Sequence, residues 1–303
     1  MPSNPDSERK KEGRLFIVST PIGNLADITL RALDTLRSVD LIAAEDTRRT
    51  RKLLSYYDIH KPLISYHEHN AAQRGSDLME KIASGRSVAL VTDAGTPGVS
   101  DPGKFLIDSA LEHGVEPVAI PGPTAVIAAL IVSGLPPQPF VFLGFPPARG
   151  AERRSFFEIN ACLEMTMVLY ESPGRLGKTL KDMLENWGDR KVAVARELTK
   201  IHEEIFRGLI SESIDHFSDR VRGELTLVVE GATPGLNNSK GCSGPQSSSP
   251  SAWKDDLEHL LSQGLSSKEA ASIIAGTFKI SRRMVYQAAL EKKGEKASPL
   301  SKP

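Results

Sequence analysis

Residues 88–103 constrain the fold of this chain more than any other stretch. The apolar, β-branched run at 88–91 predicts a buried strand. The loop that follows contains three glycines and two prolines, so its backbone is stiff and can come close to a ligand. Such a loop after a central strand is typical of the ligand-binding edge of an open α/β sheet. Asp93 stands at the strand exit, where it holds either a polar group of a ligand or the turn itself.

The same order of strand, small-residue loop and helix recurs along the first half of the chain. One helix carries Leu30, Leu33 and Leu36 at helical spacing, and Asp27 or Thr29 can cap it. Repetition of this order predicts a parallel α/β sheet. Besides 88–91, its strands are expected at residues 14–19, 39–44, 63–66 and 115–120.

A second lobe follows the first. The apolar helix at 126–133 and a proline-rich hinge at 136–139 lead into it. Helices and charged loops separate the later strands of this lobe. Its strands are expected at residues 140–144, 165–170, 191–196 and 225–230.

The composition changes abruptly after the second lobe. Residues 232–251 are rich in Gly, Ser, Pro and Asn, which predicts a flexible linker. Beyond it, Trp253, Leu257, Leu260 and Leu261 share one helix face, and two short helices follow that resemble either a helix-turn-helix or a plain helical hairpin. The domains are assigned as a disordered tail (1–13), two α/β lobes (14–125 and 126–231), the linker (232–251), a helical module (252–293) and a basic tail (294–303).

The charge balance limits the kinds of partner. Lys and Arg number 38 and so do Asp and Glu, so contact with nucleic acid depends on a local basic patch. The best patch in the core consists of Arg48, Arg49, Arg51 and Lys52. Acidic residues directly precede this patch, so an ion-pair network is the alternative. We expect a cytoplasmic protein, because the chain has no apolar run of membrane-spanning length, no N-terminal signal sequence, and only two cysteines, which predict neither a disulfide framework nor a zinc site.

Residues that can move a proton follow two of the predicted strands. Parallel strand order brings both runs to the edge that carries the glycine-rich loops. The candidate catalytic residues are Glu45, Asp46, His67 and Glu68. A carboxylate beside Arg48 would have a lowered pKa, so Glu68 is the better proton acceptor, and Glu45 and Asp46 are orienting groups. The sequence contains no Walker motif and no metal-ligand spacing, which argues against phosphate cradling and a metal site.

Five motifs in one order match a known family. They are Thr-Pro-Ile-Gly-Asn-Leu (20–25), Ala-Glu-Asp-Thr-Arg (44–48), His-Glu-His-Asn (67–70), Asp-Ala-Gly-Thr-Pro (93–97) and Pro-Gly-Pro (121–123). Together they resemble the ribosomal RNA small-subunit methyltransferase I family of the tetrapyrrole methylase superfamily, the class III methyltransferases. The resemblance covers residues 14–231, and the helical module is similar to the family's C-terminal appendage. The Ser-rich linker departs from the family pattern.

The resemblance implies a two-lobed α/β fold that binds S-adenosylmethionine in a cleft and forms a homodimer. It implies methyl transfer, without a metal, to the ribose 2′-hydroxyl of a cytidine in the decoding region of 16S rRNA, either free or within the 30S subunit. The implied cofactor-binding residues are Pro21, Ile22 and Gly23 in the first loop, Asp93, Ala94, Gly95 and Val99 in the second, Thr124 and Ala125 in the third, and Gly144 and Ser172 in the second lobe.

Two other functions stay open at this point. A tetrapyrrole carbon methyltransferase would share the core, but a porphyrin requires neither the basic patch nor the helical module. A DNA-binding regulator built on the C-terminal helices is the second alternative, and the large two-lobed core argues against it.

Overall fold

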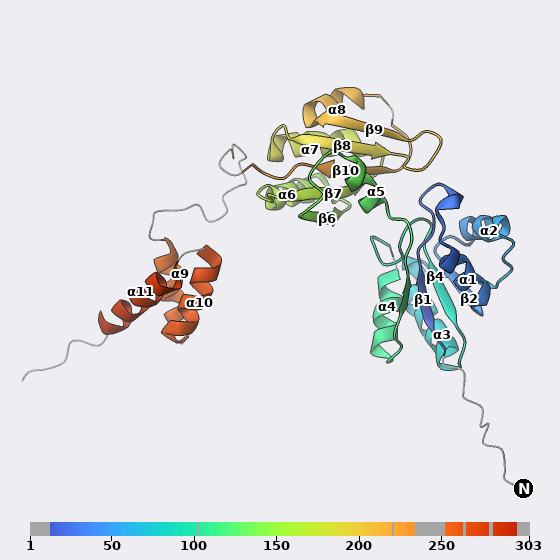
Figure 1. Cartoon of the computed structure of the whole chain (residues 1–303), viewed down its shortest axis with the longest axis horizontal. Helices are drawn as coiled ribbons and strands as arrows, with labels where there is room; N and C mark the ends of the chain where they lie inside the picture. The colour runs from blue at the N-terminus through green and yellow to red at the C-terminus, as the bar shows by residue number, and fades with distance from the viewer. Residues whose placement is uncertain are drawn as a thin grey trace, which may run out of the picture. The chain divides into compact units, whose positions relative to one another are not determined.

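The computed structural model describes residues 13–101, 103–219, 221–233, 252–262, 265–278 and 281–295. It divides the chain into two units, Met1–Cys242 and Ser243–Pro303 (Figure 1). Nearly all of the predicted tail at 1–13, linker at 232–251 and basic tail at 294–303 lies outside the described residues.

The first lobe is built on a five-stranded parallel sheet with the order β3-β2-β4-β1-β5. Its strands are β1 (Leu15–Val18), β2 (Leu41–Ala44), β3 (Leu63–Ser65), β4 (Val88–Val91) and β5 (Val118–Ile120). The central strand β4 is the first part of residues 88–103, the stretch from which the fold was predicted. All four of its residues are buried, as expected for a parallel strand with both faces covered. The predicted parallel α/β fold is confirmed.

Helices cover both faces of this sheet. α1 and α2 pack on one face through Leu36 and Leu54, and α3 and α4 pack on the other through Leu78 and Leu106. Because the helices occupy the two faces, the carboxyl edge of the sheet is formed by the loops that follow the strands. The helical segments of the lobe are η1 (Leu25–Asp27), α1 (Leu30–Ser38), α2 (Thr47–Tyr56), η2 (Glu68–Asn70), α3 (Ala71–Ala83) and α4 (Gly103–Glu112).

Helix α1 begins at one of its two predicted caps. The Thr29 hydroxyl oxygen accepts a hydrogen bond from the Ala32 backbone N–H at 3.1 Å, so Thr29 and not Asp27 is the cap. Leu36 is fully buried, but Leu30 is 80% exposed. Leu30 therefore does not share the buried face of α1, which begins at Ala32.

The second lobe is built on a mixed five-stranded sheet with the order β6-β7-β10-β8-β9. β6 runs parallel to β7, and the other neighbours are antiparallel. The strands are β6 (Phe140–Gly144), β7 (Thr166–Glu171), β8 (Lys191–Arg196), β9 (Glu204–Leu209) and β10 (Leu225–Val229). The sequence did not predict β9, because this edge strand is only partly buried and has no continuous apolar run.

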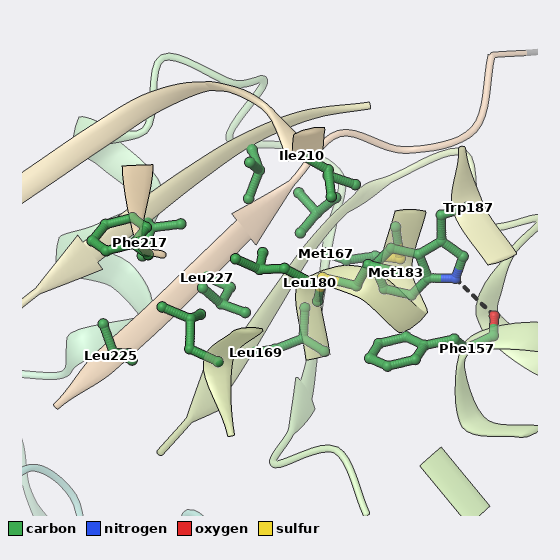
Figure 2. Packing of buried hydrophobic residues seen from close by; sticks show 14 of the residues in the cluster. Phe157, Met167, Leu169, Leu180, Met183, Trp187, Ile210, Phe217, Leu225 and Leu227 are labelled. Carbon is green, nitrogen blue, oxygen red and sulfur yellow. Dashed lines mark hydrogen bonds between the residues drawn. The ribbon is translucent and has the colours of Figure 1, made fainter. Parts of the chain in front are cut away.

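Alternate residues of β7 face two different cores. Met167 and Leu169 face the core of helices α6 to α8, whereas Val168 faces α5 on the other side of the sheet. Figure 2 shows the first core, in which the Trp187 indole N–H donates a hydrogen bond of 2.7 Å to the Phe157 carbonyl oxygen. This bond ties α7 to α6. The helices are α5 (Ala125–Val132), α6 (Gly150–Asn160), α7 (Leu176–Trp187) and α8 (Ile210–His216).

The structure corrects one expectation that came from the cysteine count. Cys162, an exposed residue in the turn after α6, is disulfide-bonded. The other cysteine, Cys242, lies outside the described residues. Two cysteines far apart in sequence carry no spacing signal, so their number alone did not predict the bond.

The described residues of the second unit form three helices with a core of their own. Trp253 and Leu257 are buried in this core, and Leu260 and Leu261 pack against it, so the predicted shared helix face is confirmed. The helices are α9 (Ala252–Ser262), α10 (Ser267–Phe278) and α11 (Arg282–Glu295).

Candidate active site

The loops that follow β1 and β4 pair with each other at the carboxyl edge of the first sheet. The Thr20 backbone N–H donates to the Gly95 carbonyl oxygen at 2.8 Å, and the Gly95 N–H donates back to Thr20 at 3.1 Å. Gly95 has a φ of +81°, a conformation that glycine adopts without strain. The Thr20 hydroxyl also donates to the Thr92 carbonyl oxygen at 3.1 Å. The two loops therefore present one continuous backbone surface.

A cleft of about 380 Å³ opens beside these loops, lined by residues of both lobes. Eight of the residues expected to bind the cofactor line it: Ile22, Asp93, Ala94, Gly95, Val99, Thr124, Ala125 and Ser172. Pro21 and Gly23 line an adjoining hollow of about 220 Å³. The cleft thus gathers, from four separate segments, most of the residues that the family resemblance implied.

Gly144 differs from the other residues expected to bind the cofactor. It lies at the end of β6, and the described residues lining the cleft and the adjoining hollow do not include it. The next residue, Phe145, lines the cleft and packs near the ring of Tyr170, with 5.4 Å between the ring centroids. The structure therefore gives Phe145 in place of Gly144 as the residue of this segment that reaches the cleft.

Glu45 and Asp93 form an acidic wall of the cleft. The Glu45 carboxylate accepts hydrogen bonds from the Thr92 hydroxyl (2.6 Å) and the Asp93 backbone N–H (3.2 Å). The Asp93 carboxylate accepts from the Asp46 N–H (3.0 Å) and lies 3.4 Å from the Arg49 guanidinium. Burial and the nearby Glu45 raise the pKa of Asp93, and Arg49 acts in the opposite direction. The hydrogen bonds hold Glu45 in one orientation.

Asp46 begins helix α2. Its carboxylate accepts hydrogen bonds of 2.8 Å from the Arg48 backbone N–H and from the Arg48 guanidinium. These bonds lower the pKa of Asp46 well below its usual range. Arg48 and Arg49 are therefore both paired with carboxylates. For these two residues the structure shows the ion-pair network that the sequence left open as the alternative to a basic patch. Arg51 and Lys52 are exposed on the same helix, and the described part of the chain shows no ion pair for either.

The Asn70 side chain fixes which ring nitrogen of a neutral His67 carries the proton. Its carbonyl oxygen accepts a hydrogen bond from the His67 backbone N–H at 2.9 Å, so its NH₂ group must point to the Ser65 carbonyl oxygen (3.2 Å) and to His67 Nε2 (3.3 Å). Nε2 is then an acceptor, and a neutral His67 carries its proton on Nδ1. Nδ1 is buried and has no hydrogen-bond partner among the described residues. The ring nitrogen that could accept a proton, Nε2, is therefore already engaged by the Asn70 amide.

Glu68 lines an outer hollow of about 600 Å³ next to the cleft, together with His67. Three residues, Glu45, Ser100 and Asp101, line both the hollow and the cleft. The candidate catalytic residues Glu45, His67 and Glu68 therefore lie around one cavity system. Asp46 lines neither cavity, since its side chain is engaged at the start of α2.

The sequence reasoning missed Glu171, a fully buried carboxylate of the cleft wall. It lies 2.7 Å from the Arg175 guanidinium and accepts hydrogen bonds from the Ser172 backbone N–H (2.6 Å) and the Thr179 hydroxyl. Burial also raises the pKa of its neighbour Tyr170. The sequence did offer one indication of this site. Glu171 and Ser172 stand at the end of a strand, as Glu45 and Asp93 do, and strand ends were the basis for predicting those two residues.

The two lobes touch at the first loop. The Asn24 backbone N–H donates to the Thr199 hydroxyl of the second lobe at 3.0 Å. A side chain at Gly23 would collide there, because its Cβ would lie 2.5 Å from Lys200 Cγ and 2.8 Å from Thr199 Oγ1. Thr199 itself has a φ of +67°, which is uncommon for a β-branched residue. This contact holds the first loop beside the cleft.

Two absences are relevant to the chemistry. Within the described ranges, no group of three or more His, Cys, Asp or Glu residues is placed to hold a metal ion. None of the helices in those ranges has the length and apolar character needed to cross a membrane.

Comparisons with known proteins agree with this geometry. Residues 14–213 match the family described as Tetrapyrrole (Corrin/Porphyrin) Methylases. Ribosomal RNA small subunit methyltransferase I of Synechocystis sp. is 45% identical over 281 residues, 92% of this chain and 98% of the relative. The protein of the same name from Thermotoga maritima is 50% identical over 220 residues, 72% of this chain and 99% of the relative.

A solved structure gives the same fold. It is uroporphyrin-III C-methyltransferase from Thermus thermophilus, complexed with S-adenyl homocysteine. It superposes with a TM-score of 0.52 at 19% identity, and the match covers 71% of this chain and 97% of that one. The strand-end loops, the two-lobed fold and the identity over nearly the whole length of the relatives lead to one conclusion: this chain belongs to the tetrapyrrole methylase family and, within it, to the ribosomal RNA small subunit methyltransferase I proteins.

Proposed function

We propose that this chain transfers a methyl group from S-adenosylmethionine to the ribose 2′-hydroxyl of a cytidine in the decoding region of 16S rRNA. The observation that carries the proposal is the cleft, where residues from four separate segments converge in a protein of a family named for methylation. The 45% identity with a protein named ribosomal RNA small subunit methyltransferase I supports an rRNA substrate, and an rRNA substrate supports a location in the cytoplasm.

The residues of the cleft fit the cofactor. A volume of about 380 Å³ is within the usual range for a small-molecule site. Ile22, Ala94, Val99 and Ala125 offer small apolar surfaces, and the backbone at Gly95 is open to close approach. The related uroporphyrin-III C-methyltransferase was solved with S-adenyl homocysteine, which supports the same class of ligand. When bound, the cofactor supplies a methyl group on a positively charged sulfur.

The chain's own residues have two tasks in this reaction. They must align the 2′-oxygen with the methyl carbon, which is work of proximity and orientation. They must also accept the proton of the hydroxyl as the oxygen–carbon bond forms and the carbon–sulfur bond breaks. We assign proton acceptance to Glu68, because Glu45 is held by Thr92 and Asp93 and acts as an orienting group.

Binding of the RNA would use the basic residues of helix α2. Arg51 and Lys52 are exposed on α2, and Arg48 and Arg49 are partly neutralised by their carboxylate partners. We propose that the helical module adds affinity but no chemistry. The Thermotoga maritima relative supports this division, because it matches this chain over 99% of its own length and yet covers only 72% of this chain.

An exposed apolar face supports a homodimer. Helix α5 is apolar all round, which is typical of a buried helix. Ile127 and Ile131, four residues apart on one face, are nevertheless 43% and 69% exposed, and Phe140 of the neighbouring segment is 37% exposed. We propose that a second copy of the chain covers this face. Analytical ultracentrifugation of the Ile131→Asp variant should then show monomer where the wild type shows dimer.

The methyl transfer is tested with labelled S-adenosylmethionine and three acceptors: 30S subunits from cells that lack this protein, free 16S rRNA, and a porphyrin precursor. We expect label only in the RNA, and mass spectrometry of its nucleosides to show 2′-O-methylcytidine. Comparison of the first two acceptors identifies the substrate as free or assembled RNA. Label in the porphyrin precursor alone would establish the small-molecule alternative.

A further inference from the structure

We infer that the outer hollow beside the cleft is the subsite for the nucleobase of the target nucleotide, with the ring of Phe105 as its stacking surface. The inference rests on the proposed function, because it presumes an RNA substrate. It adds a binding site for the base beside the cleft that holds the cofactor.

The hollow and the cleft are neighbours. Glu45, Ser100 and Asp101 line both of them, so a nucleoside held in the hollow has its ribose next to the cleft. This is the arrangement that transfer to a ribose hydroxyl requires, since the sugar must face the methyl group while the base lies elsewhere.

The wall between the two cavities is preorganised. The Asp101 carboxylate accepts hydrogen bonds from the backbone N–H groups of Gly98 (2.6 Å) and Gly103 (2.8 Å). Between them, Ser100 is held at a φ of +63°, a conformation that residues other than glycine rarely adopt. Backbone held in this way is common at ligand sites. The loop therefore meets a ligand without rearranging.

Phe105 is an aromatic side chain without a structural role. It lies in the first turn of α4, whose core face is formed by Leu106 and Ala110. Phe105 itself is 63% exposed, and it lines the outer hollow. It is the only aromatic ring other than the two imidazoles in the described lining of that hollow.

The chemistry of the hollow suits an unstacked RNA base. Proteins that read single-stranded RNA stack splayed-out bases on aromatic side chains, and an enzyme that acts within folded RNA must expose its target nucleotide. Next to Phe105, Lys104 is exposed and ion-paired with Asp108 of the same helix. The hollow therefore offers an aromatic surface for a base, and the three residues shared with the cleft place the sugar beside the cofactor.

The test uses the full chain and 30S subunits from cells that lack this protein. We compare Phe105→Ala with Phe105→Tyr, which keeps an aromatic ring, and with Leu111→Ala as a control. Leu111 is 51% exposed on the same helix and lines neither cavity. Three quantities are measured: the affinity for S-adenosylhomocysteine, the 30S concentration that gives half-maximal single-turnover rate, and the site of photochemical cross-linking between protein and RNA.

We expect Phe105→Ala to raise the half-saturating 30S concentration about 5- to 150-fold, the range for loss of one stacked base, with unchanged cofactor affinity. Phe105→Tyr should restore most of it, and ultraviolet light should join Phe105 of the wild type to the methylated cytidine. If the wild type methylates 30S subunits and Phe105→Ala behaves like Leu111→Ala, the inference is wrong while the proposed function holds. If the wild type methylates no RNA, both fail.

Discussion

Arg49 and Asp93 form an ion pair in the wall of the cleft, with Arg49 Nη1 3.4 Å from Asp93 Oδ2. The pair joins a residue expected to bind RNA to a residue expected to bind the cofactor. Asp93 is also close to Glu45, and burial and this second carboxylate outweigh Arg49, so the pKa of Asp93 is raised. The site thus keeps a carboxylate at a position where its charge is costly.

The first prediction concerns stability. A carboxylate whose pKa rises on folding stabilises the fold below its unfolded pKa of about 3.9, and that contribution is lost as pH rises through the folded value. Asp93→Asn should therefore raise the melting temperature at pH 7, and the difference should disappear below about pH 4. Thermal unfolding across this pH range checks it, with Asp77→Asn on α3 as control. A lower melting temperature at pH 7 would mean that the ion pair outweighs the cost of burial.

The second prediction concerns the cofactor. Ala94 lines both the cleft and the adjoining hollow, so Ala94→Leu should fill the space that the cofactor needs. Overpacking of this kind costs about 1–3 kcal/mol, which corresponds to about a 5- to 150-fold loss of affinity. Calorimetry with S-adenosylhomocysteine measures it, and Ala83→Leu, an exposed position on α3, is the control. Equal affinities for the two variants would place the cofactor elsewhere.

The third prediction concerns proton removal. Glu68→Gln keeps the shape of the side chain but removes the proton acceptor, so single-turnover methylation should slow by about 10²–10⁴-fold with both ligands saturating. Binding of cofactor and RNA should stay near wild type. Glu80→Gln, an exposed change on α3, provides the comparison. A normal rate for Glu68→Gln would leave proton transfer to water or to Glu45.

The fourth prediction concerns RNA binding by the basic residues of α2, some of which form ion pairs and some of which do not. Arg51 is exposed with no ion pair in the described part of the chain, whereas Arg48 is bound to Asp46. Arg51→Ala should reduce the slope of log affinity for RNA against log salt by about 1, and Arg48→Ala should reduce it by less. Fluorescence anisotropy at several salt concentrations measures the slopes, and Lys181→Ala in the second lobe should change nothing. Identical slopes for all variants would place the RNA on another surface.

The fifth prediction concerns the helical module. A chain that ends after residue 233 should bind S-adenosylhomocysteine as tightly as the full chain, because the cleft is complete within the first unit. The shortened chain should need a higher RNA concentration for methylation, because it lacks the RNA contact that the helical module would provide. Titration of 30S subunits at fixed enzyme concentration measures this. Full activity at low RNA concentration would remove any substrate role for the module.

The sequence predicted what depends on local pattern. The buried strands and the small-residue loops after them, such as the loop at Gly95, are encoded in consecutive residues and were found. The strand β9 and the buried Glu171 were missed, because an edge strand needs no apolar run and a buried carboxylate is recognised only by its distant partner Thr179. The tautomer of a neutral His67 could not be predicted for the same reason, since it follows from the direction of the Asn70 side-chain amide.

The close contact at Gly23 has a consequence for how this family can vary. A methyl group added there would meet Lys200 and Thr199 of the other lobe, so alanine at position 23 would force the two lobes apart or push the loop away from the cleft. A larger residue at position 23 is therefore compatible only with a compensating change at 199 or 200. These positions are distant in the chain and belong to different lobes. We expect their substitutions to be correlated among relatives, because each change at position 23 must preserve the spacing of the two lobes.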